Sequence, residues 1–113
     1  MKRNDIWLVN LDPTMGAEIQ KTRPVIIVND DALGLLPLRI IVPITDWKSH
    51  YSSAVWMVKV IPNSNNNLSK ISSADCFQVR SISTNRFIKK IGVIDTIQIE
   101  EIETALANVL KIV

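Results

Sequence analysis

Short runs of hydrophobic residues alternate with turn-forming residues along most of the chain. Apolar runs of about four to eight residues, bounded by Gly, Pro, Asn or Asp, are typical of β-strands. The pattern predicts strands at residues 6–9, 24–28, 38–42, 54–61, 77–82 and 88–94. The run at 24–28 is apolar without alternation, which favours a strand that is buried on both faces. Polar residues at 29–34 and 62–67 predict loops.

The period of the pattern changes from Asp95 onward, where hydrophobic residues recur every three or four positions. Asp95 is suited to cap a helix, and Gln98 follows in the capping-box position. The hydrophobic positions of this helix are Ile99, Ile102, Leu106, Val109 and Val113. Several short strands followed by one amphipathic helix predict a mainly β fold with a C-terminal helix, built as a strongly bent sheet or a small SH3-like barrel.

The length and composition set the size and the environment of this fold. A chain of 113 residues, 47% of them hydrophobic, can form one core, so we expect a single domain over residues 1–113. Cys76 is the only cysteine, which excludes a disulfide within the chain and suits a reducing compartment. The N-terminus lacks a signal-peptide pattern, and no apolar stretch approaches the roughly 20 residues of a membrane span. We expect a soluble cytoplasmic protein that does not enter a membrane.

Charge is unevenly distributed, although the net charge is only +2. Residues 1–94 hold twelve Lys and Arg against seven Asp and Glu, whereas residues 95–113 hold one against four. A basic body with an acidic C-terminal element fits a polyanionic ligand on one face. An imbalance of this size is also common in proteins that bind no nucleic acid, so charge alone does not define the ligand.

The polar segment between the first two predicted strands ends at Arg23, directly before Pro24. A residue before proline favours an extended backbone, so we expect the Arg23 side chain to project from the start of the strand. A guanidinium held in this way can bind a phosphate through two parallel hydrogen bonds. The structural alternative is an ion pair of Arg23 with Glu18 or Asp12. His50 is the only histidine and no residue cluster has metal-ligand spacing, so we expect neither a metal nor another cofactor.

Four ordered parts of the sequence resemble the MazF/PemK family of toxin endoribonucleases. They are the opening segment 5–13, the loop residues Gly16, Glu18, Arg23 and Pro24, the strand segment 41–45, and the segment Gln78-Val79-Arg80-Ser81-Ile82. Each motif alone is weak, but their order and spacing agree along nearly the whole chain.

The resemblance implies an SH3-like barrel of the plasmid maintenance toxin type, and a homodimer. It also implies the toxin component of a type II toxin–antitoxin system, which cleaves single-stranded RNA, mRNA above all, without a metal. Its cognate antitoxin would lay an acidic, flexible segment along the RNA groove. The catalytic arginine and threonine of the family correspond to Arg23 and Thr45. The structural alternative for Thr45 is that it only begins a turn with Asp46.

RNA can be cleaved without a metal when its own 2′-hydroxyl attacks the adjacent phosphorus, which leaves a 2′,3′-cyclic phosphate and a 5′-hydroxyl. The protein must align the attacking oxygen, neutralise the phosphoryl charge and assist proton transfer. Arginine remains protonated in proteins, so Arg23 suits charge stabilisation and proton donation rather than the role of general base. Thr45 can donate a hydrogen bond to a phosphoryl or leaving oxygen. Glu18 or a water molecule remains as the base.

Other polar residues near these segments are candidate RNA contacts. We expect phosphate contacts from Lys21, Thr22, Lys48 and Arg80, and a base contact from Gln78. Phe77 stands where many family members carry an acidic residue that can touch a base, so we expect the sequence preference of this chain to differ. If the segment is a strand, Asp75 shares the face of Phe77. Phe77 itself fits a base-stacking residue and a core residue equally well.

The aromatic residues and the cysteine also have structural interpretations. Trp7 and Trp56 lie inside predicted strands, so a place in the core is favoured over base stacking. Trp47 lies in a predicted loop and fits either role. We expect His50 to be exposed and Cys76 to be a small buried residue rather than a nucleophile.

Two other functions fit the same fold. A related toxin family poisons gyrase and cuts nothing, and its activity resides in a C-terminal Trp-Gly-Ile ending. The present chain ends in residues 110–113, Leu-Lys-Ile-Val, which argues against that function. The other alternative is a non-catalytic SH3-like module that binds RNA or a peptide, in which Arg23 and Thr45 have no chemical role.

Overall fold

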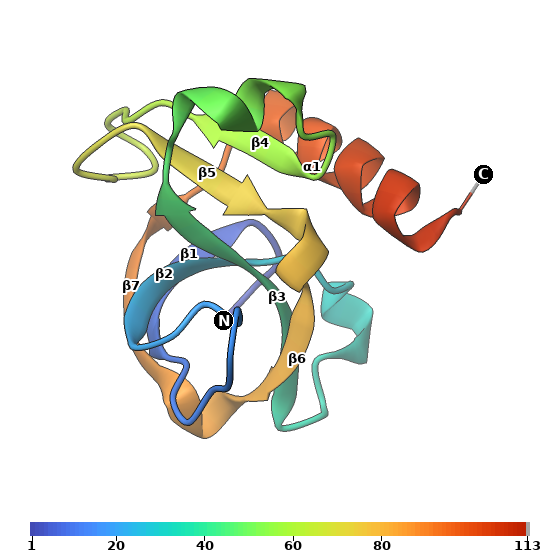
Figure 1. Ribbon diagram of the computed structural model, residues 1–113. Helices are drawn as coiled ribbons and strands as arrows, with labels where there is room; N and C mark the ends of the chain where they lie inside the picture. Colours follow the sequence, from blue (N-terminus) through green and yellow to red (C-terminus); the bar gives the residue numbers. More distant parts are fainter. Residues whose placement is uncertain (113) are drawn as a thin grey trace.

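The structure, a computed structural model, describes residues 1–112 and consists of a bent antiparallel sheet with one long helix against it (Figure 1). Val113, the last position of the expected helix pattern, lies outside the described residues. The strands are β1 (Asp5–Asn10), β2 (Thr22–Ile27), β3 (Leu38–Asp46), β4 (Met57–Val60), β5 (Ser72–Asp75), β6 (Arg80–Ser83) and β7 (Phe87–Val93), followed by helix α1 (Thr96–Leu110). Short 3-10 turns are η1 (Asp31–Leu33), η2 (Ser49–Ser53), η3 (Cys76–Gln78) and η4 (Thr84–Arg86).

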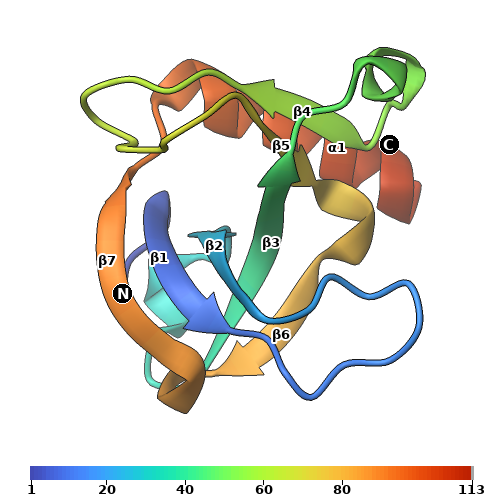
Figure 2. The same ribbon diagram turned by 60° about the vertical axis from the view of Figure 1, so that its left-hand side comes forward.

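The prediction of a mainly β fold with a C-terminal helix is confirmed. The strands follow the order β4-β5-β3-β2-β1-β7, and β6 also pairs with β3. Figure 2 shows how strongly this sheet curves around its interior. Within residues 1–112 the outer strands β4 and β7 do not pair with each other, so the sheet is barrel-like but open.

Strand β3 holds the two parts of the sheet together because it changes partners along its length. One edge of β3 pairs with β2, from Ile27 opposite Ile41 to Val25 opposite Pro43. The other edge pairs with β6 up to Ile41 and with β5 from Ile44 onward. The single long strand therefore belongs to both parts of the sheet.

Two hydrophobic clusters fill the fold. The first lies between the sheet and α1 and includes Ile26, Val42, Ile102 and Ala105. The second lies inside the bend of the sheet and includes Val25 and Ile27. Successive residues of β2 enter different clusters, which confirms that this strand is buried on both faces.

Helix α1 begins where the sequence predicts. The Asp95 carboxylate accepts a hydrogen bond from the Gln98 backbone N–H at 2.7 Å, as an N-cap residue does. The Gln98 side chain is directed to Glu101 instead of back to the cap, so only half of the expected capping box is present. Ile99 and Ile102 are buried, as the helical spacing predicts.

Three predictions about the strands are wrong. The strand predicted at 54–61 begins only at Met57, and the segment predicted as a strand from Phe77 begins instead with the turn η3. Strand β5 at 72–75 is not predicted because its residues are small and polar, although all four are buried. The hydroxyl of Ser72 donates to the Lys70 carbonyl at 2.8 Å and that of Ser73 contacts the Met57 sulfur, so the buried hydroxyls retain partners.

The expectations for the aromatic residues are met only in part. Trp7 is half-buried, packs against the second cluster and contacts Phe87 edge to face. Trp56 lies before β4 and is 39% exposed, so its predicted place in the core is wrong. Within residues 1–112, no helix is long and apolar enough to cross a membrane.

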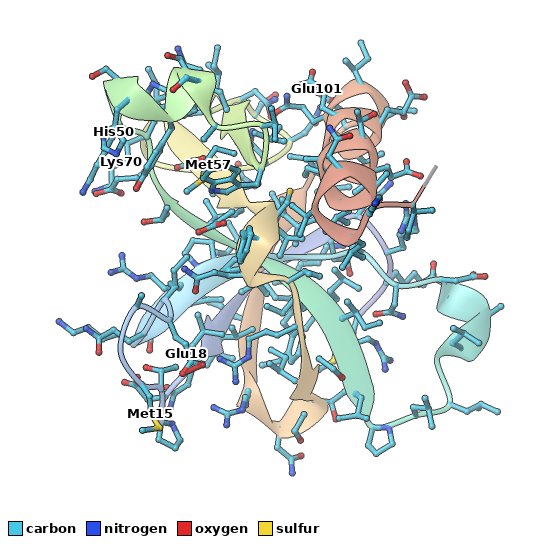
Figure 3. The ribbon with its side chains drawn as sticks, turned by 45° about the vertical axis from the view of Figure 1, so that its right-hand side comes forward. Met15, Glu18, His50, Met57, Lys70 and Glu101 are labelled. Atoms are coloured by element: carbon cyan, nitrogen blue, oxygen red, sulfur yellow. The ribbon has the colours of Figure 1, made fainter. Side chains whose placement is uncertain are left out.

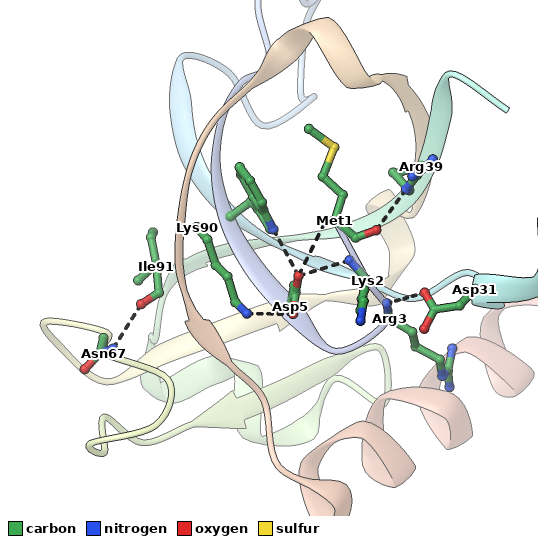
Figure 4. A network of polar contacts seen from close by, with 10 residues as sticks. Met1, Lys2, Arg3, Asp5, Asp31, Arg39, Asn67, Lys90 and Ile91 are labelled. Carbon is green, nitrogen blue, oxygen red and sulfur yellow. Dashed lines mark hydrogen bonds and ion pairs between the residues drawn. The ribbon is translucent and has the colours of Figure 1, made fainter. Parts of the chain in front are cut away.

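The buried carboxylate of Asp5 joins the N-terminus to β7 (Figure 4). It accepts hydrogen bonds from the Lys2 backbone N–H at 3.0 Å and from the Trp7 indole at 3.3 Å. Lys90 Nζ lies 3.3 Å from the same carboxylate. Burial raises the pKa of Asp5, but these donors outweigh burial and the net pKa lies below the ordinary value of 3.8.

This network predicts a loss of stability in acid. Because the pKa of Asp5 is lowered by folding, its contribution is present above the pKa of the unfolded chain and is lost as pH falls through the lower, folded value. Asp5→Asn should lower the free energy of unfolding at pH 7 by about 1–2 kcal/mol. In Asp5→Asn the urea midpoint of unfolding should also decrease less steeply as pH falls below the pKa of the unfolded chain. Glu100→Gln, on the exposed face of α1, should leave this acid dependence unchanged. An unchanged acid dependence in Asp5→Asn would contradict this account.

Candidate active site

The first candidate site lies where β2 and β3 part. The last paired residues of the two strands are Val25 and Pro43. Arg23 lies two residues before Val25 in β2 and pairs with Val9 of β1. Thr45 lies two residues after Pro43 in β3 and pairs with β5. Beyond Val25 and Pro43 the strands β2 and β3 no longer pair with each other, and they form a wedge with Arg23 on one side and Thr45 on the other.

The wedge contains a cavity of about 170 Å³, which we call the Arg23–Thr45 pocket. Its walls come from the start of β2, the end of β3, and the segment that leads into β5. The lining residues are Thr22, Arg23, Pro24, Ile44, Thr45, Asp46, Leu68, Ser69, Lys70 and Ser72. Arg23 and Thr45, separated by twenty-one residues in the sequence, therefore face one small cavity.

The Arg23 side chain is half-buried and is held at one atom. Its Nε donates to the Gln20 carbonyl at 3.3 Å. Asp12 accepts instead from the Lys21 backbone N–H at 3.0 Å, and Glu18 from the Met15 backbone N–H at 2.8 Å. Among residues 1–112 Arg23 forms no ion pair, so the interpretation as a partner of Glu18 or Asp12 is wrong, and its terminal nitrogens are available to a ligand.

Lys70 adds a second positive charge to the Arg23–Thr45 pocket. Its Nζ lies 3.1 Å from the carboxylate of Asp46, the residue after Thr45. Both side chains are more than half exposed, so this pair contributes little to stability. No motif or spacing points to Lys70, since only the folded path from β4 to β5 brings it to Asp46 at the end of β3 (Figure 3).

A second cavity, of about 470 Å³, lies between the β1–β2 loop and η3. We call it the Phe77 pocket. Its lining residues are Ala17, Glu18, Phe77, Gln78, Val79 and Arg80. The fold thus gathers Glu18, Phe77, Gln78 and Arg80, and it separates them from the lining of the Arg23–Thr45 pocket.

Phe77 is 66% exposed at the tip of η3, so its interpretation as a core residue is wrong. Trp56 contacts it edge to face, with ring centroids 6.0 Å apart. Two exposed aromatic rings therefore stand at one side of the Phe77 pocket. The hydrophobic pattern favours one strand over residues 54–61, which would place Trp56 in the core, but β4 begins only at Met57.

Asp75 does not share the face of Phe77, contrary to the expectation from a strand. It is buried, and its carboxylate caps η3 by accepting the Phe77 backbone N–H at 3.1 Å. Burial raises the pKa of Asp75, and hydrogen bonds from the Phe77 and Gln78 backbone and from the Gln78 side chain oppose this rise. Asp75 is thus a structural carboxylate that lines neither pocket.

The remaining candidates are dispersed. Thr22 lines the Arg23–Thr45 pocket, Lys21 is exposed beside it, and Lys48 is exposed at the start of η2 and lines neither pocket. His50 is exposed, as expected. Cys76 is buried, which raises the pKa of its thiol to about 12 and makes it unreactive. Among residues 1–112, no three side chains of His, Cys, Asp or Glu come together as a set of metal ligands.

Comparison with known proteins gives one consistent result. A profile of the family described as "PemK-like, MazF-like toxin of type II toxin-antitoxin system" matches residues 2–110. Endoribonuclease MazF9 of Mycobacterium tuberculosis is 28% identical over 112 residues, which cover 94% of this chain and 92% of the relative. Endoribonuclease PemK of Escherichia coli is 52% identical over 46 residues, which cover 40% of this chain and 35% of the relative.

Solved structures share the fold. The crystal structure of MazF from Deinococcus radiodurans superposes with a TM-score of 0.81 at 17% identity, covering 99% of this chain and 97% of that one. An endoribonuclease in complex with its cognate antitoxin from a mycobacterial species gives a TM-score of 0.79 at 16% identity, covering 100% and 97%.

Proposed function

The chain belongs to the family of PemK-like and MazF-like toxins of type II toxin–antitoxin systems, and we propose that it cleaves single-stranded RNA in the Arg23–Thr45 pocket. The full-length relative MazF9 and the relative PemK are endoribonucleases, and this chain is a toxin endoribonuclease of the same kind. The observation that supports the site is the convergence of an unpaired arginine and a threonine on one cavity.

The proposed reaction uses the RNA's own 2′-hydroxyl as the nucleophile. The 2′-oxygen attacks the adjacent phosphorus, the bond to the 5′-oxygen breaks, and the products carry a 2′,3′-cyclic phosphate and a 5′-hydroxyl. Arg23 stabilises the negative charge on the phosphoryl oxygens through its terminal nitrogens. Thr45 donates a hydrogen bond to a phosphoryl oxygen, and Lys70 adds a second positive charge in the same pocket.

Proton transfer in this scheme goes through solvent, which accepts the proton of the 2′-hydroxyl and returns a proton to the departing 5′-oxygen. Arg23 donates hydrogen bonds and remains protonated, so it does not act as the base. Glu18 lines the Phe77 pocket rather than the Arg23–Thr45 pocket, and Asp46 is paired with Lys70. We therefore assign the acceptance of the 2′-hydroxyl proton to a water molecule.

The Phe77 pocket is proposed to hold a base next to the cleaved phosphate. The exposed rings of Phe77 and Trp56 offer stacking surfaces, while Glu18 and Arg80 offer an acceptor and a donor for base edges. Thr22, Lys21 and Lys48 are proposed to contact the RNA backbone. An aromatic residue at position 77 then gives a sequence preference different from that of relatives with an acid there.

The partners follow from the family. A homologue of the same fold is known in complex with its cognate antitoxin. We propose that the antitoxin of this chain covers the Arg23–Thr45 pocket with an acidic, flexible segment that competes with RNA for Arg23 and Lys70. We also propose that the protein forms a homodimer and acts in the cytoplasm, where its substrate is mRNA.

Purified protein should cleave a long single-stranded RNA in the presence of EDTA and leave 2′,3′-cyclic phosphate and 5′-hydroxyl ends, because the substrate supplies the nucleophile. Mass spectrometry of the fragments identifies both ends. Cleavage that requires added Mg²⁺, or that leaves 5′-phosphates, would overturn the mechanism. RNA binding without cleavage would support the binding module, and gyrase inhibition without cleavage would support the gyrase poison.

Arg23→Ala should lower kcat about 10²–10³-fold, the usual effect of removing one positioned transition-state donor. Arg23→Lys should also be impaired, since an ammonium cannot reproduce two parallel hydrogen bonds. Thr45→Val, which removes the hydroxyl at almost constant volume, should reduce cleavage more than RNA binding. Lys89→Ala, which removes one surface charge on β7, is the control. Near-normal cleavage by Arg23→Ala would show that the site lies elsewhere.

Phe77→Glu should change the sites at which RNA is cut while the protein stays folded. The position is exposed, so the new carboxylate remains solvated, and it can accept hydrogen bonds from base amino groups where Phe can only stack. Cleavage-site mapping by sequencing, beside a thermal melt, is the measurement. A folded variant with an unchanged cut pattern would contradict the specificity role of the Phe77 pocket.

A further inference from the structure

The Gln78 side chain forms a complete set of hydrogen bonds inside the protein. Its Oε1 accepts the Ile19 backbone N–H at 2.6 Å. Its Nε2 donates to the Ala17 carbonyl at 3.2 Å and to Asp75 Oδ2 at 3.3 Å. The amide that was expected to read a base is therefore already bonded to the β1–β2 loop and to a buried carboxylate.

The amide is supported by a bulge at η3 and by Asp75. Ile41 of β3 pairs with Arg80 of β6, and Ile44 of β3 pairs with Ala74 of β5. Three residue steps along β3 therefore correspond to six steps from Ala74 to Arg80, and the additional residues form an outward bulge at η3. The bulge is held by Asp75, whose other oxygen accepts the Phe77 backbone N–H. Gln78 is thus bonded to Asp75 on one side and to Ala17 and Ile19 of the β1–β2 loop on the other. The ribbon shows this loop and the segment between β5 and β6 on the same side of the molecule (Figure 2).

The loop that Gln78 holds leads directly to Arg23. Ile19 is followed by Gln20, whose carbonyl accepts from Arg23 Nε. The Ile19 side chain packs against the second hydrophobic cluster, so its backbone and side chain are anchored at once. A continuous chain of contacts connects Asp75 through Gln78 and the loop to the guanidinium of Arg23.

We propose that Gln78, oriented by Asp75, is a positioning residue that latches the β1–β2 loop so that Arg23 stands opposite Thr45. The same latch sets the spacing between the loop and η3, and therefore the width of the Phe77 pocket. This inference rests on the proposed role of Arg23 in cleavage. Gln78 acts through the loop and does not itself read a base.

The first test is Gln78→Met, which keeps the length of the side chain and removes every hydrogen bond. Exchange of the Ile19 amide proton, measured by NMR, should accelerate at least roughly tenfold, because its acceptor is gone. The kcat for RNA cleavage should fall at least roughly tenfold with a much smaller change in KM, since misplacement of about 1 Å can cost 10²-fold in rate. Gln98→Met, on the surface of α1, is the matched control.

The second test exchanges the polarity of the Asp75–Gln78 pair. Gln78→Glu places a carboxylate against Asp75 and should reduce kcat at least as much as Gln78→Met. Asp75→Asn combined with Gln78→Glu restores a donor and an acceptor between the two residues and keeps acceptors for Phe77 and Ile19. It leaves the Ala17 carbonyl without its donor, so it should recover part, and not all, of the lost kcat. A thermal melt of each variant separates the latch from a loss of fold, because loss of the latch lowers kcat in a protein that remains folded.

Three results would overturn the latch. The first is an Ile19 amide that stays protected from exchange in Gln78→Met, and the second is an unchanged kcat in a folded Gln78→Met. The third is a changed cut pattern in Gln78→Met with Ile19 protection retained, which would make Gln78 a base contact. Because Ile19 exchange is measured without RNA, it tests the latch even if the wild-type protein cleaves no RNA and the proposed function fails.

Discussion

The change of partners along β3 is the constraint on which the rest of the structure depends. An edge of a strand can pair with one neighbour at a time, and buried backbone groups must be paired. One edge of β3 pairs with β2 only as far as Pro43, and the other edge changes its partner from β6 to β5 between Ile41 and Ile44. The wedge left behind is where Arg23 and Thr45 meet, so the candidate active site arises from strand pairing rather than from a local motif.

The two pockets are linked through one segment of chain. The β1–β2 loop supplies Ala17 and Glu18 to the Phe77 pocket, and its end supplies Thr22 and Arg23 to the Arg23–Thr45 pocket. A movement of this loop would alter both at once. Under the proposed mode of RNA binding, this arrangement would couple the selection of a base to the alignment of the phosphate, which is what cleavage at particular sequences requires.

The structure accommodates an aromatic ring at position 77, where the family resemblance leads us to expect an acid in many members. Position 77 lies at the exposed tip of a bulge, where either a carboxylate or an aromatic ring is tolerated because neither is buried. The adjacent Asp75 cannot replace the missing acid, since its carboxylate is buried and occupied in capping η3 and holding Gln78. The change therefore alters the chemistry of the Phe77 pocket without altering the frame around it.

The sequence by itself determined the fold class, the helix with its Asp95 cap and the doubly buried strand, and it supplied Arg23 and Thr45 as the proposed catalytic pair, because hydrophobic period, capping chemistry and ordered motifs are local properties. Strand β5, the bulge at η3 and the entry of Lys70 into the site depend on pairing across β3, which no local pattern encodes. For the same reason Gln78 bonds to the β1–β2 loop where a base contact was predicted, and Asp75 caps η3 where a place on the face of Phe77 was predicted. A side chain's partners are fixed by which backbone groups the tertiary structure leaves within its reach, and for Gln78 two of those groups lie some sixty residues away along the chain.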